Sequence, residues 1–549
     1  MSGRGRWARA LASVATVFAV AAGGPGGTDP AGGGGDPLTV RTDKGEVRGA
    51  LSGPSGHRLF QGIPYAGPPV GEHRWAGPRP AAPWEGVRDA SAPGPLCPQV
   101  ASVYAPVSSE EEDCLVLNVT APAGGRARGP APVLVWIHGD GAVGGGSFFD
   151  AGRLADRGVL VVTVNYRLGI FGGFAHAGLE EAGSFALRDQ QAALRWVRRN
   201  AAAFGGDPGR VTLAGSSFGA SAITAHLTSP GARGLFHRAV LSSGEGVMDM
   251  PAGAMGPEVP GYPWFSWRTE RETRDIGTEM TAPLGCARPD PVETVRCLRA
   301  LPVKRILAVP DIMNAFQVFA HGNATLPELP PDALRAGRFH RVPVLSGATL
   351  DEHRIFVGIR YDAVGRVFSS GDYDKALTTA FGGDADTVRA AYPETDFDSP
   401  AIAWSTVITD RMWARGTHAQ HTLLGRRVPL YAYEFADRDA PMYLPLPGSF
   451  DFGAYHAGDT PYVFEDPDAQ AHFTPAQVRL ADTITDSWSA FARTGTPDAA
   501  GAARWPRYRP ADPVPHTRSL APERIGPVDY AREHRLEFWE RLAGPGPGL

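Results

Sequence analysis

One serine in this sequence stands between two glycines at a spacing that can support acyl-transfer chemistry. Residues 215–219 read Gly-Ser-Ser-Phe-Gly, which places Ser217 at the centre of a Gly-x-Ser-x-Gly pattern. Where this pattern joins a strand to a helix, a tight turn exposes the serine hydroxyl, and only residues without bulk fit on either side. A glycine-rich turn with an incidental serine is the alternative. The pattern favours Ser217 as a nucleophile.

A serine nucleophile also needs a general base and hydrogen-bond donors for the oxyanion that develops on the substrate. An upstream glycine-rich loop offers such donors, because residues 138–141 read His-Gly-Asp-Gly and residues 144–146 are all glycine. This loop is similar to the HGGG-type loop of lipases and esterases, where substrate approaches bare backbone. We expect the N–H groups of Asp140, Gly141 and Phe218 to form the oxyanion hole.

The elements around both loops can be predicted from apolar runs and periodicity. Predicted strands cover residues 133–137, 159–166, 210–214, 238–241, 342–345 and 429–435. Predicted helices cover residues 187–204, whose apolar positions form one stripe, and residues 220–227. A strand therefore enters the Ser217 turn and a helix leaves it. The alternation predicts an α/β protein with a mostly parallel sheet flanked by helices, in which residues 247–330 form insertions or a cap.

Further motifs, in the same order along the chain, resemble those of the type-B carboxylesterases, the carboxylesterase/cholinesterase family. They lie at residues 60–66 (FQGIPYA), 112–118 (EDCLVLN), 136–139 (WIHG), 164–169 (VNYRLG), 189–197 (DQQAALRWV), 204–208 (FGGDP) and 488–497 (WSAFARTGTP). The resemblance covers roughly residues 38 to 540. It implies an α/β-hydrolase fold, hydrolysis of small-molecule carboxylic esters and no cofactor.

The resemblance also nominates the other members of a catalytic triad, which in such enzymes follow the serine in the order acid, then histidine. The acid falls on Glu352, just after the predicted strand at 342–345, with Asp351 as the fallback. The base falls on His456, in preference to His138, which opens the glycine-rich loop, and His353, which is too close to Glu352 in sequence.

The sequence departs from the family pattern beside the proposed nucleophile. Ser216 stands where the family usually has glutamate, Phe218 where it has alanine, and Asp140 where it has glycine. Asp tolerates left-handed backbone angles better than most residues, and we expect its carboxylate to turn away from the oxyanion. Ser243 matches a family serine that supports the triad.

The four cysteines form two pairs that are local in sequence, Cys97 with Cys114 and Cys286 with Cys297. Four cysteines allow three connectivities, and sequence alone does not choose among them. The resemblance implies the two local disulfides. Because the sequence has no Cys-x-x-Cys and no thiol–imidazole cluster, no metal site is expected.

The first residues resemble an export signal. Arg4, Arg6 and Arg9 precede an apolar run over residues 10–22 that is too short to span a bilayer. We predict a signal peptide at residues 1–22, a Gly/Pro-rich linker at 23–37, a single catalytic domain at 38–545, secretion, and no stable membrane anchor. Only three of the 53 basic residues are lysine, which is typical of GC-rich bacterial coding.

Composition narrows the class of partner. The net charge of −5 does not indicate the basic surface that nucleic-acid binding requires. The sequence does not determine the oligomeric state. The leading interpretation is a secreted serine hydrolase of small to medium neutral esters. The alternatives are acyltransferase or thioesterase use of the same triad, and a non-catalytic binding module of cholinesterase-like fold.

Overall fold

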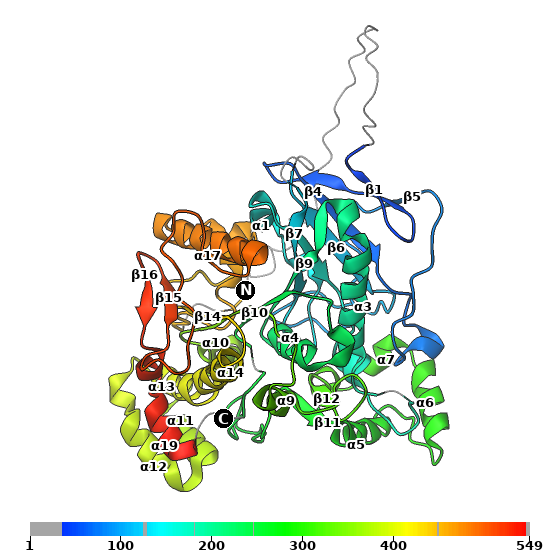
Figure 1. The fold of residues 1–549 in the computed structure, drawn as a ribbon. Coiled ribbons are helices and arrows are strands. Elements are labelled where there is room, and N and C mark those ends of the chain that lie inside the picture. Colours follow the sequence, from blue (N-terminus) through cyan, green and yellow to red (C-terminus); the bar gives the residue numbers. More distant parts are fainter. Residues whose placement is uncertain (1–35, 124–128, 181, 245, 447–449, 545–549) are drawn as a thin grey trace, which may run out of the picture. The chain divides into compact units, whose positions relative to one another are not determined.

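The centre of the protein is an 11-stranded mixed sheet, with strand order β16-β15-β14-β13-β10-β9-β7-β8-β6-β4-β3 (Figure 1). The computed structural model describes residues 36–123, 129–180, 182–244, 246–446 and 450–544. The predicted signal peptide lies outside the described residues, as does the linker up to residue 35. From Leu38 onward the chain forms one compact unit.

The sheet is parallel in its middle and antiparallel at both ends. Strands β8, β7, β9, β10, β13, β14 and β15 pair in parallel, whereas β3, β4, β6 and β16 add antiparallel pairs. Their bounds are Ala50–Ser52 (β3), His57–Pro64 (β4), Val116–Ala121 (β6), Ala131–Ile137 (β7), Leu160–Val164 (β8), Gly206–Ser216 (β9), Arg238–Ser242 (β10), Val344–Thr349 (β13), Leu430–Phe435 (β14), Thr517–Ala521 (β15) and Arg524–Val528 (β16). The predicted α/β-hydrolase fold is confirmed.

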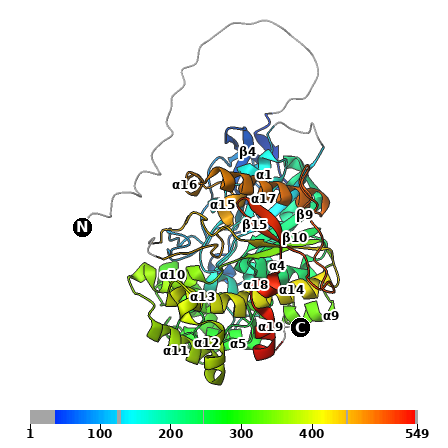
Figure 2. The ribbon, with the colours of Figure 1, turned by 90° about the vertical axis from the view of Figure 1, so that its left-hand side faces the viewer.

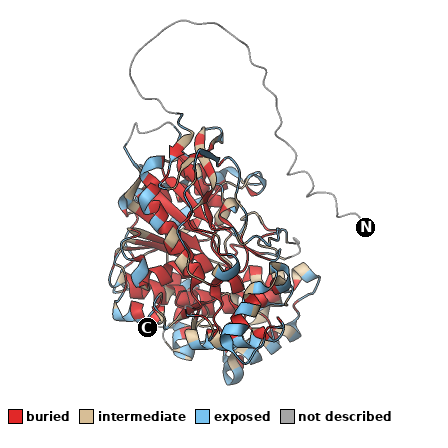
Figure 3. Cartoon of the chain, turned by 90° about the vertical axis from the view of Figure 1, so that its right-hand side faces the viewer, coloured by how far each residue is buried: buried red, intermediate tan, exposed pale blue. Residues whose placement is uncertain are grey.

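Helices cover both faces of the sheet, which explains why the central strand β7 is apolar at every position. On β7, Val133 and Val135 belong to the core cluster that includes residues of α3 (Phe185–Asn200), α4 (Phe218–Thr228) and α14 (Arg415–Gly425). The intervening Leu134 packs into the opposite cluster, with α17 (Pro475–Thr494). Figure 2 shows the strands between α17 on one side and α4 and α14 on the other, and Figure 3 shows the buried layers.

The strand before Ser217 and the helix after it extend closer to this residue than the sequence predicted. The predicted strand at 210–214 extends to Ser216 as β9, and the helix predicted from residue 220 begins at Phe218. The helix predicted at 187–204 is α3 followed by a 3-10 turn, Ala201–Phe204, and Gly205 ends that turn at a left-handed φ of 94°. The strand and helix therefore leave no spacer around Ser217.

The region predicted as insertions contains a separate two-stranded parallel sheet and several helices. They are β11 (Trp267–Thr269), β12 (Phe319–His321), α5 (Glu270–Thr281), α6 (Pro291–Ala300), α7 (Val303–Leu307) and α8 (Ile312–Ala315). One disulfide, Cys286–Cys297, joins α6 to the preceding loop, and the other joins Cys97 to Cys114. Both pairs are those that the family resemblance implies.

The remaining elements surround this frame. A small sheet holds β1 (Thr39–Arg41), β2 (Glu46–Arg48) and β5 (Val87–Asp89). The other helices are α1 (Gly152–Asp156), α2 (Gly169–Gly173), α9 (Pro330–Ala336), α10 (Arg354–Arg360), α11 (Ser370–Phe381), α12 (Ala385–Ala391), α13 (Pro400–Ile408), α15 (Thr460–Val463), α16 (Pro467–Gln470), α18 (Tyr530–Glu533) and α19 (Leu536–Ala543). Within the described residues, no helix has the length and apolar character needed to cross a membrane.

Candidate active site

Ser217 occupies a strained turn between β9 and α4. Its backbone angles, φ 57° and ψ −127°, lie in a region that residues with a side chain rarely adopt. The Ser217 N–H donates to the carbonyl of Ser242 on the neighbouring strand β10, at 2.9 Å. The turn places Ser217 at the N-cap position of α4, where the helix dipole adds positive potential.

The glycines on either side of Ser217 are required by close packing rather than by their own backbone angles. A Cβ atom on Gly219 would lie 2.1 Å from the carbonyl oxygen of Ile137, and one on Gly215 would lie 2.6 Å from the same atom. The turn is therefore pressed against the end of β7. The glycine-rich loop that follows β7 also passes close to the serine, because a Cβ on Gly139 would lie 3.0 Å from the Ser217 Cβ.

Glu352 and His456 form a buried pair although 104 residues separate them. One Glu352 oxygen contacts His456 Nδ1, and the other accepts the N–H of Thr349, the last residue of β13, at 2.7 Å. The two side chains are only 1% and 4% exposed. The ring of His456 packs against Trp413 at 4.8 Å and Phe356 at 5.2 Å between ring centroids. The carboxylate and the two rings hold the imidazole in one orientation.

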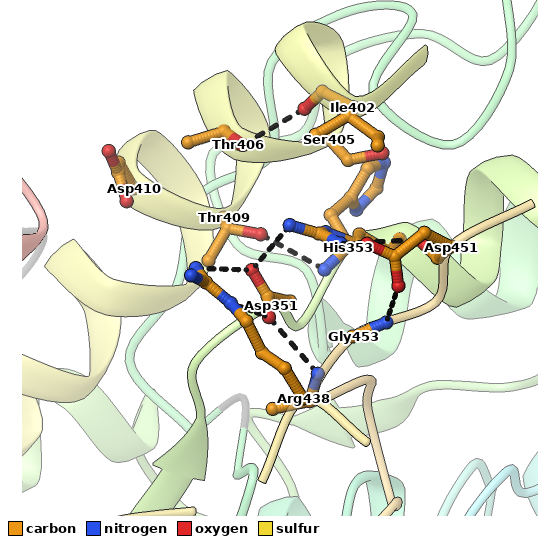
Figure 4. Close-up of polar contacts among 12 residues, drawn as sticks. Asp351, His353, Ile402, Ser405, Thr406, Thr409, Asp410, Arg438, Asp451 and Gly453 are labelled. Atoms are coloured by element: carbon orange, nitrogen blue, oxygen red, sulfur yellow. Dashed lines mark hydrogen bonds and ion pairs between the residues drawn. The ribbon is translucent and has the colours of Figure 1, made fainter. Parts of the chain in front are cut away.

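The adjacent carboxylate, Asp351, faces other partners (Figure 4). Its oxygens accept two hydrogen bonds from Arg438, at 2.9 and 3.1 Å, and it pairs with Arg354 at 3.1 Å. Asp351 also accepts the N–H of Ala454 at 3.0 Å and donates its own N–H to the Ala454 carbonyl. Asp351 thereby ties the loop that carries His456 to the turn that carries Glu352.

The two rival histidines are held in structural positions. His353 contacts the carbonyl of Ala254 through Nε2 and accepts the Trp413 indole N–H through Nδ1. His138 stacks on Tyr166 at 4.5 Å between ring centroids, and its Nδ1 lies 3.1 Å from the Gly139 carbonyl. Burial lowers the pKa of His353 to about 3 and that of His138 to about 4, so both rings are neutral near pH 7.

Asp140 shapes the glycine-rich loop from within. Its φ is 64°, in the left-handed region, and its carboxylate accepts the N–H groups of Ala142 and Val143 at 2.8 and 3.0 Å. The charge is thus directed into the loop's own backbone. Burial raises the pKa of the Asp140 carboxyl, and these two hydrogen bonds oppose that rise.

Two of the expected oxyanion donors, Phe218 and Gly141, differ in their present partners. Phe218 is the first residue of α4, so its N–H has no acceptor within the helix. The Gly141 N–H donates to the Gly139 carbonyl at 2.9 Å. The Phe218 ring fills the space left by the missing Gly141 side chain, where a Cβ would lie 2.5 Å from the ring, and it stacks on Phe319 at 4.3 Å. Gly141 and Phe319 together accommodate the phenylalanine.

A further buried carboxylate, Asp459, belongs to this site and was missed by the sequence analysis. It is 5% exposed and accepts the Ser242 hydroxyl at 2.8 Å, while the Ser242 carbonyl binds the Ser217 N–H. Burial and the negative charge of Glu352 raise the pKa of Asp459 to about 6. Its position three residues after His456 was the only sequence signal.

The serines expected to modify the site make no comparable contact. The hydroxyl of Ser243 is buried and has no hydrogen-bond partner among the described residues, and the same holds for Ser216. Ser242, not Ser243, links the Ser217 turn to the loop of His456 through Asp459.

Asp459 gives a testable pH dependence of stability. Its folded-state pKa of about 6 exceeds the ordinary value of 3.8, so wild-type stability falls as pH rises through this interval and the penalty is complete above pH 6. Relative to wild type, Asp459→Asn should gain up to about 3 kcal/mol of unfolding free energy between pH 4 and pH 7. Urea unfolding at pH 4, 5, 6 and 7 measures this difference. Asp468→Asn, an exposed residue of α16, is the control, and a flat difference for Asp459→Asn would contradict the expectation.

Another buried histidine, His534, contacts two carboxylates, and both its nitrogens are engaged. His534 lies between Asp410 and Glu434, each at 2.7 Å. Although burial opposes it, these two partners raise the pKa of His534 to about 10. An imidazolium that donates a hydrogen bond from each nitrogen has no lone pair with which to accept a proton. His534 therefore anchors the C-terminal segment rather than acting as a base.

Comparison with known proteins places these features in context. Residues 36–539 match the pattern of the carboxylesterase family. The chain is 34% identical to the para-nitrobenzyl esterase of Bacillus subtilis (strain 168), over 85% of this chain and 92% of that protein. It is 32% identical to the fumonisin B1 esterase of Sphingopyxis macrogoltabida, over 86% and 85%. It is 31% identical to carboxylesterase 3 of Pongo abelii, over 91% and 90%.

Proposed function

Because this chain belongs to the carboxylesterase family and is a carboxylic-ester hydrolase, we propose that Ser217, His456 and Glu352 form its catalytic triad. The observation that carries the proposal is the buried Glu352–His456 pair at the end of β13. An imidazole whose Nδ1 faces a carboxylate presents Nε2 as a base. The Ser217 turn adds a hydroxyl in strained geometry, tied to the loop of His456 through Ser242 and Asp459.

The reaction is proposed to run through an acyl-enzyme. His456 Nε2 takes the hydroxyl proton as the Ser217 oxygen attacks the ester carbonyl, and Glu352 stabilises the imidazolium. The tetrahedral oxyanion accepts hydrogen bonds from the backbone N–H groups of Phe218, Asp140 and Gly141. Gly141 must exchange its bond to the Gly139 carbonyl for one to substrate. The imidazolium then protonates the leaving alcohol, and water repeats the sequence on the acyl group.

We propose small to medium neutral esters as substrates. Apolar rings flank the reacting groups, with Phe356 and Trp413 against His456 and Phe319 against Phe218. Such walls favour uncharged organic groups next to the scissile bond. The names of the relatives, a para-nitrobenzyl esterase and a fumonisin B1 esterase, are compatible with organic esters as a class.

Secretion is proposed from the N-terminal sequence and the disulfides. An Arg-flanked apolar run over residues 10–22 resembles an export signal. Both disulfides would persist in an oxidising compartment. The single catalytic domain is proposed to begin at residue 38 and end near residue 545.

Covalent labelling tests the proposed nucleophile directly. The chain from residue 23 onward should hydrolyse p-nitrophenyl acetate and butyrate, and diethyl p-nitrophenyl phosphate should abolish this turnover with one equivalent bound. Mass spectrometry of the digested protein should locate the diethylphosphoryl group on Ser217. Labelling elsewhere, or turnover that survives stoichiometric labelling, would contradict the proposal. A folded chain that is neither labelled nor active would indicate a binding module.

A further inference from the structure

A cavity of about 110 Å³ lies next to the proposed active site and is separate from the reacting groups. Its lining comes from the loop around Gly253–Pro257 and from helices α10, α11 and α13. Met255, Phe368 and Trp404 contribute apolar walls. None of these residues is used by the proposed mechanism.

One aromatic ring separates this cavity from the proposed base. Phe356 lines the cavity, and its ring centroid lies 5.2 Å from that of His456. The same ring stacks on Trp413 at 5.4 Å, so the cavity wall and the support of His456 share one side chain. Since the imidazolium protonates the leaving alcohol, the alcohol part of an ester lies on the histidine side of the reacting carbonyl. Phe356 links this histidine side to the cavity, because it contacts His456 and lines the cavity.

The cavity carries more positive than negative charge. Arg360, Arg366 and Lys375 line it, against one lining carboxylate, Asp372. Asp372 accepts the N–H and hydroxyl of Ser369 at 2.9 and 2.6 Å in the capping box of α11, and it also attracts Arg366 and Lys375, so the lining keeps an excess of positive charge.

The three cations differ in how far they are already paired. Arg360 pairs with Glu258. Arg366 lies over the Tyr361 ring at 5.0 Å. Lys375 makes no ion pair with a carboxylate in the part of the chain that the structure describes. Lys375 and Arg366 are thus placed to meet an incoming anion.

We propose that this cavity binds the alcohol arm of ester substrates that end in an anionic group such as a carboxylate, with Lys375 as the principal recognition residue. The inference rests on the proposed ester hydrolysis and extends its substrate range: besides neutral esters, the site accepts esters whose alcohol part ends in a carboxylate. The apolar walls would contact the methylene chain, and Lys375 and Arg366 would face its charged end.

Two acetate esters that differ only at the end of the alcohol arm test this proposal. Hexyl acetate ends in a methyl group, and 6-acetoxyhexanoate ends in a carboxylate. For Lys375→Glu, the ratio of kcat/KM for 6-acetoxyhexanoate to that for hexyl acetate should fall by up to about fivefold from the wild-type ratio, the effect of one exposed charge contact. Acetate release at constant pH gives both rates. In wild type, 0.5 M NaCl should lower the same ratio, because salt screens exposed charges.

Two controls separate this proposal from the proposed function. Phenyl acetate, which has no alcohol arm long enough to reach the cavity, should be hydrolysed equally by wild type and Lys375→Glu. Lys304→Glu, an equal charge change on the exposed face of α7, should leave the substrate ratio within twofold of wild type. An unchanged ratio in Lys375→Glu, or an equal fall in Lys304→Glu, would overturn the cavity proposal.

Octanoate binding provides a readout that needs no turnover. Calorimetry should detect octanoate binding to wild type and weaker binding to Lys375→Glu, and equal or absent binding would overturn the cavity proposal. If wild type failed to hydrolyse phenyl acetate, the proposed function would be wrong. Octanoate binding would then be the only test of whether the cavity binds an apolar chain that ends in a carboxylate.

Discussion

Replacing Ser217 with alanine is expected to lower kcat/KM for short esters by at least about a thousandfold, because the substitution removes the proposed attacking oxygen. The fold should survive. The Ser217 side chain makes no capping hydrogen bond to α4, and alanine keeps the Cβ atom that the turn already accommodates. Residual turnover would come from the oxyanion hole and from binding alone.

Hydrolysis of p-nitrophenyl acetate, followed by absorbance, measures this loss. The matched control is Ser216→Ala, which removes a neighbouring hydroxyl that has no hydrogen-bond partner among the described residues. This control should keep its activity within a few-fold of wild type. Comparable turnover by Ser217→Ala and wild type would remove Ser217 from the mechanism, whereas inactivity of both variants would point to damage of the turn.

Replacing Glu352 with glutamine is expected to lower kcat by about 10³–10⁴-fold, with a smaller change in KM. The amide keeps the shape of the side chain but loses the charge that stabilises the imidazolium, and it no longer enforces the tautomer that exposes Nε2. The effect should be large because both Glu352 and His456 are buried, so water cannot replace the lost interaction.

The adjacent carboxylate provides the contrast. Asp351→Asn weakens the contacts to Arg438, Arg354 and the Ala454 N–H, so it should lower the unfolding free energy by about 1–3 kcal/mol. Because Asp351 does not contact His456, kcat should fall far less than in Glu352→Gln. Urea unfolding and steady-state kinetics on both variants give the two rankings. If Asp351→Asn lost more kcat than Glu352→Gln, the acid would be assigned to the wrong carboxylate.

Local sequence determined the parts of this protein that depend on short-range sterics. The Ser217 turn, the glycine-rich loop and the central strands were predicted from residues within about ten positions of each other. Glycine spacing encodes a close approach of backbones, and continuous apolar runs encode strands buried on both faces. The motifs and their order along the chain predicted the family, and the match over residues 36–539 confirmed it.

Only the tertiary structure decided which side chains meet across the sheet. Local sequence does not distinguish Asp351 from Glu352; the family resemblance favoured Glu352, and the structure shows its contact with His456, 104 residues away. The carboxylate of Asp459 gains its raised pKa from burial, which its sequence neighbours do not specify. The cavity beside Phe356 likewise combines separate helices and a loop, none of which carries a recognisable motif.

The division has a physical reason. Backbone conformation and strand burial depend on neighbouring residues, so a short pattern can encode them. The position of a buried charge depends on packing between segments that are distant in sequence, and its pKa depends on the desolvation and fields that this packing creates. The reaction class of this chain could therefore be predicted from its sequence. The packing that sets the pKa values of buried groups and forms the substrate-binding cavity exists only in the folded molecule.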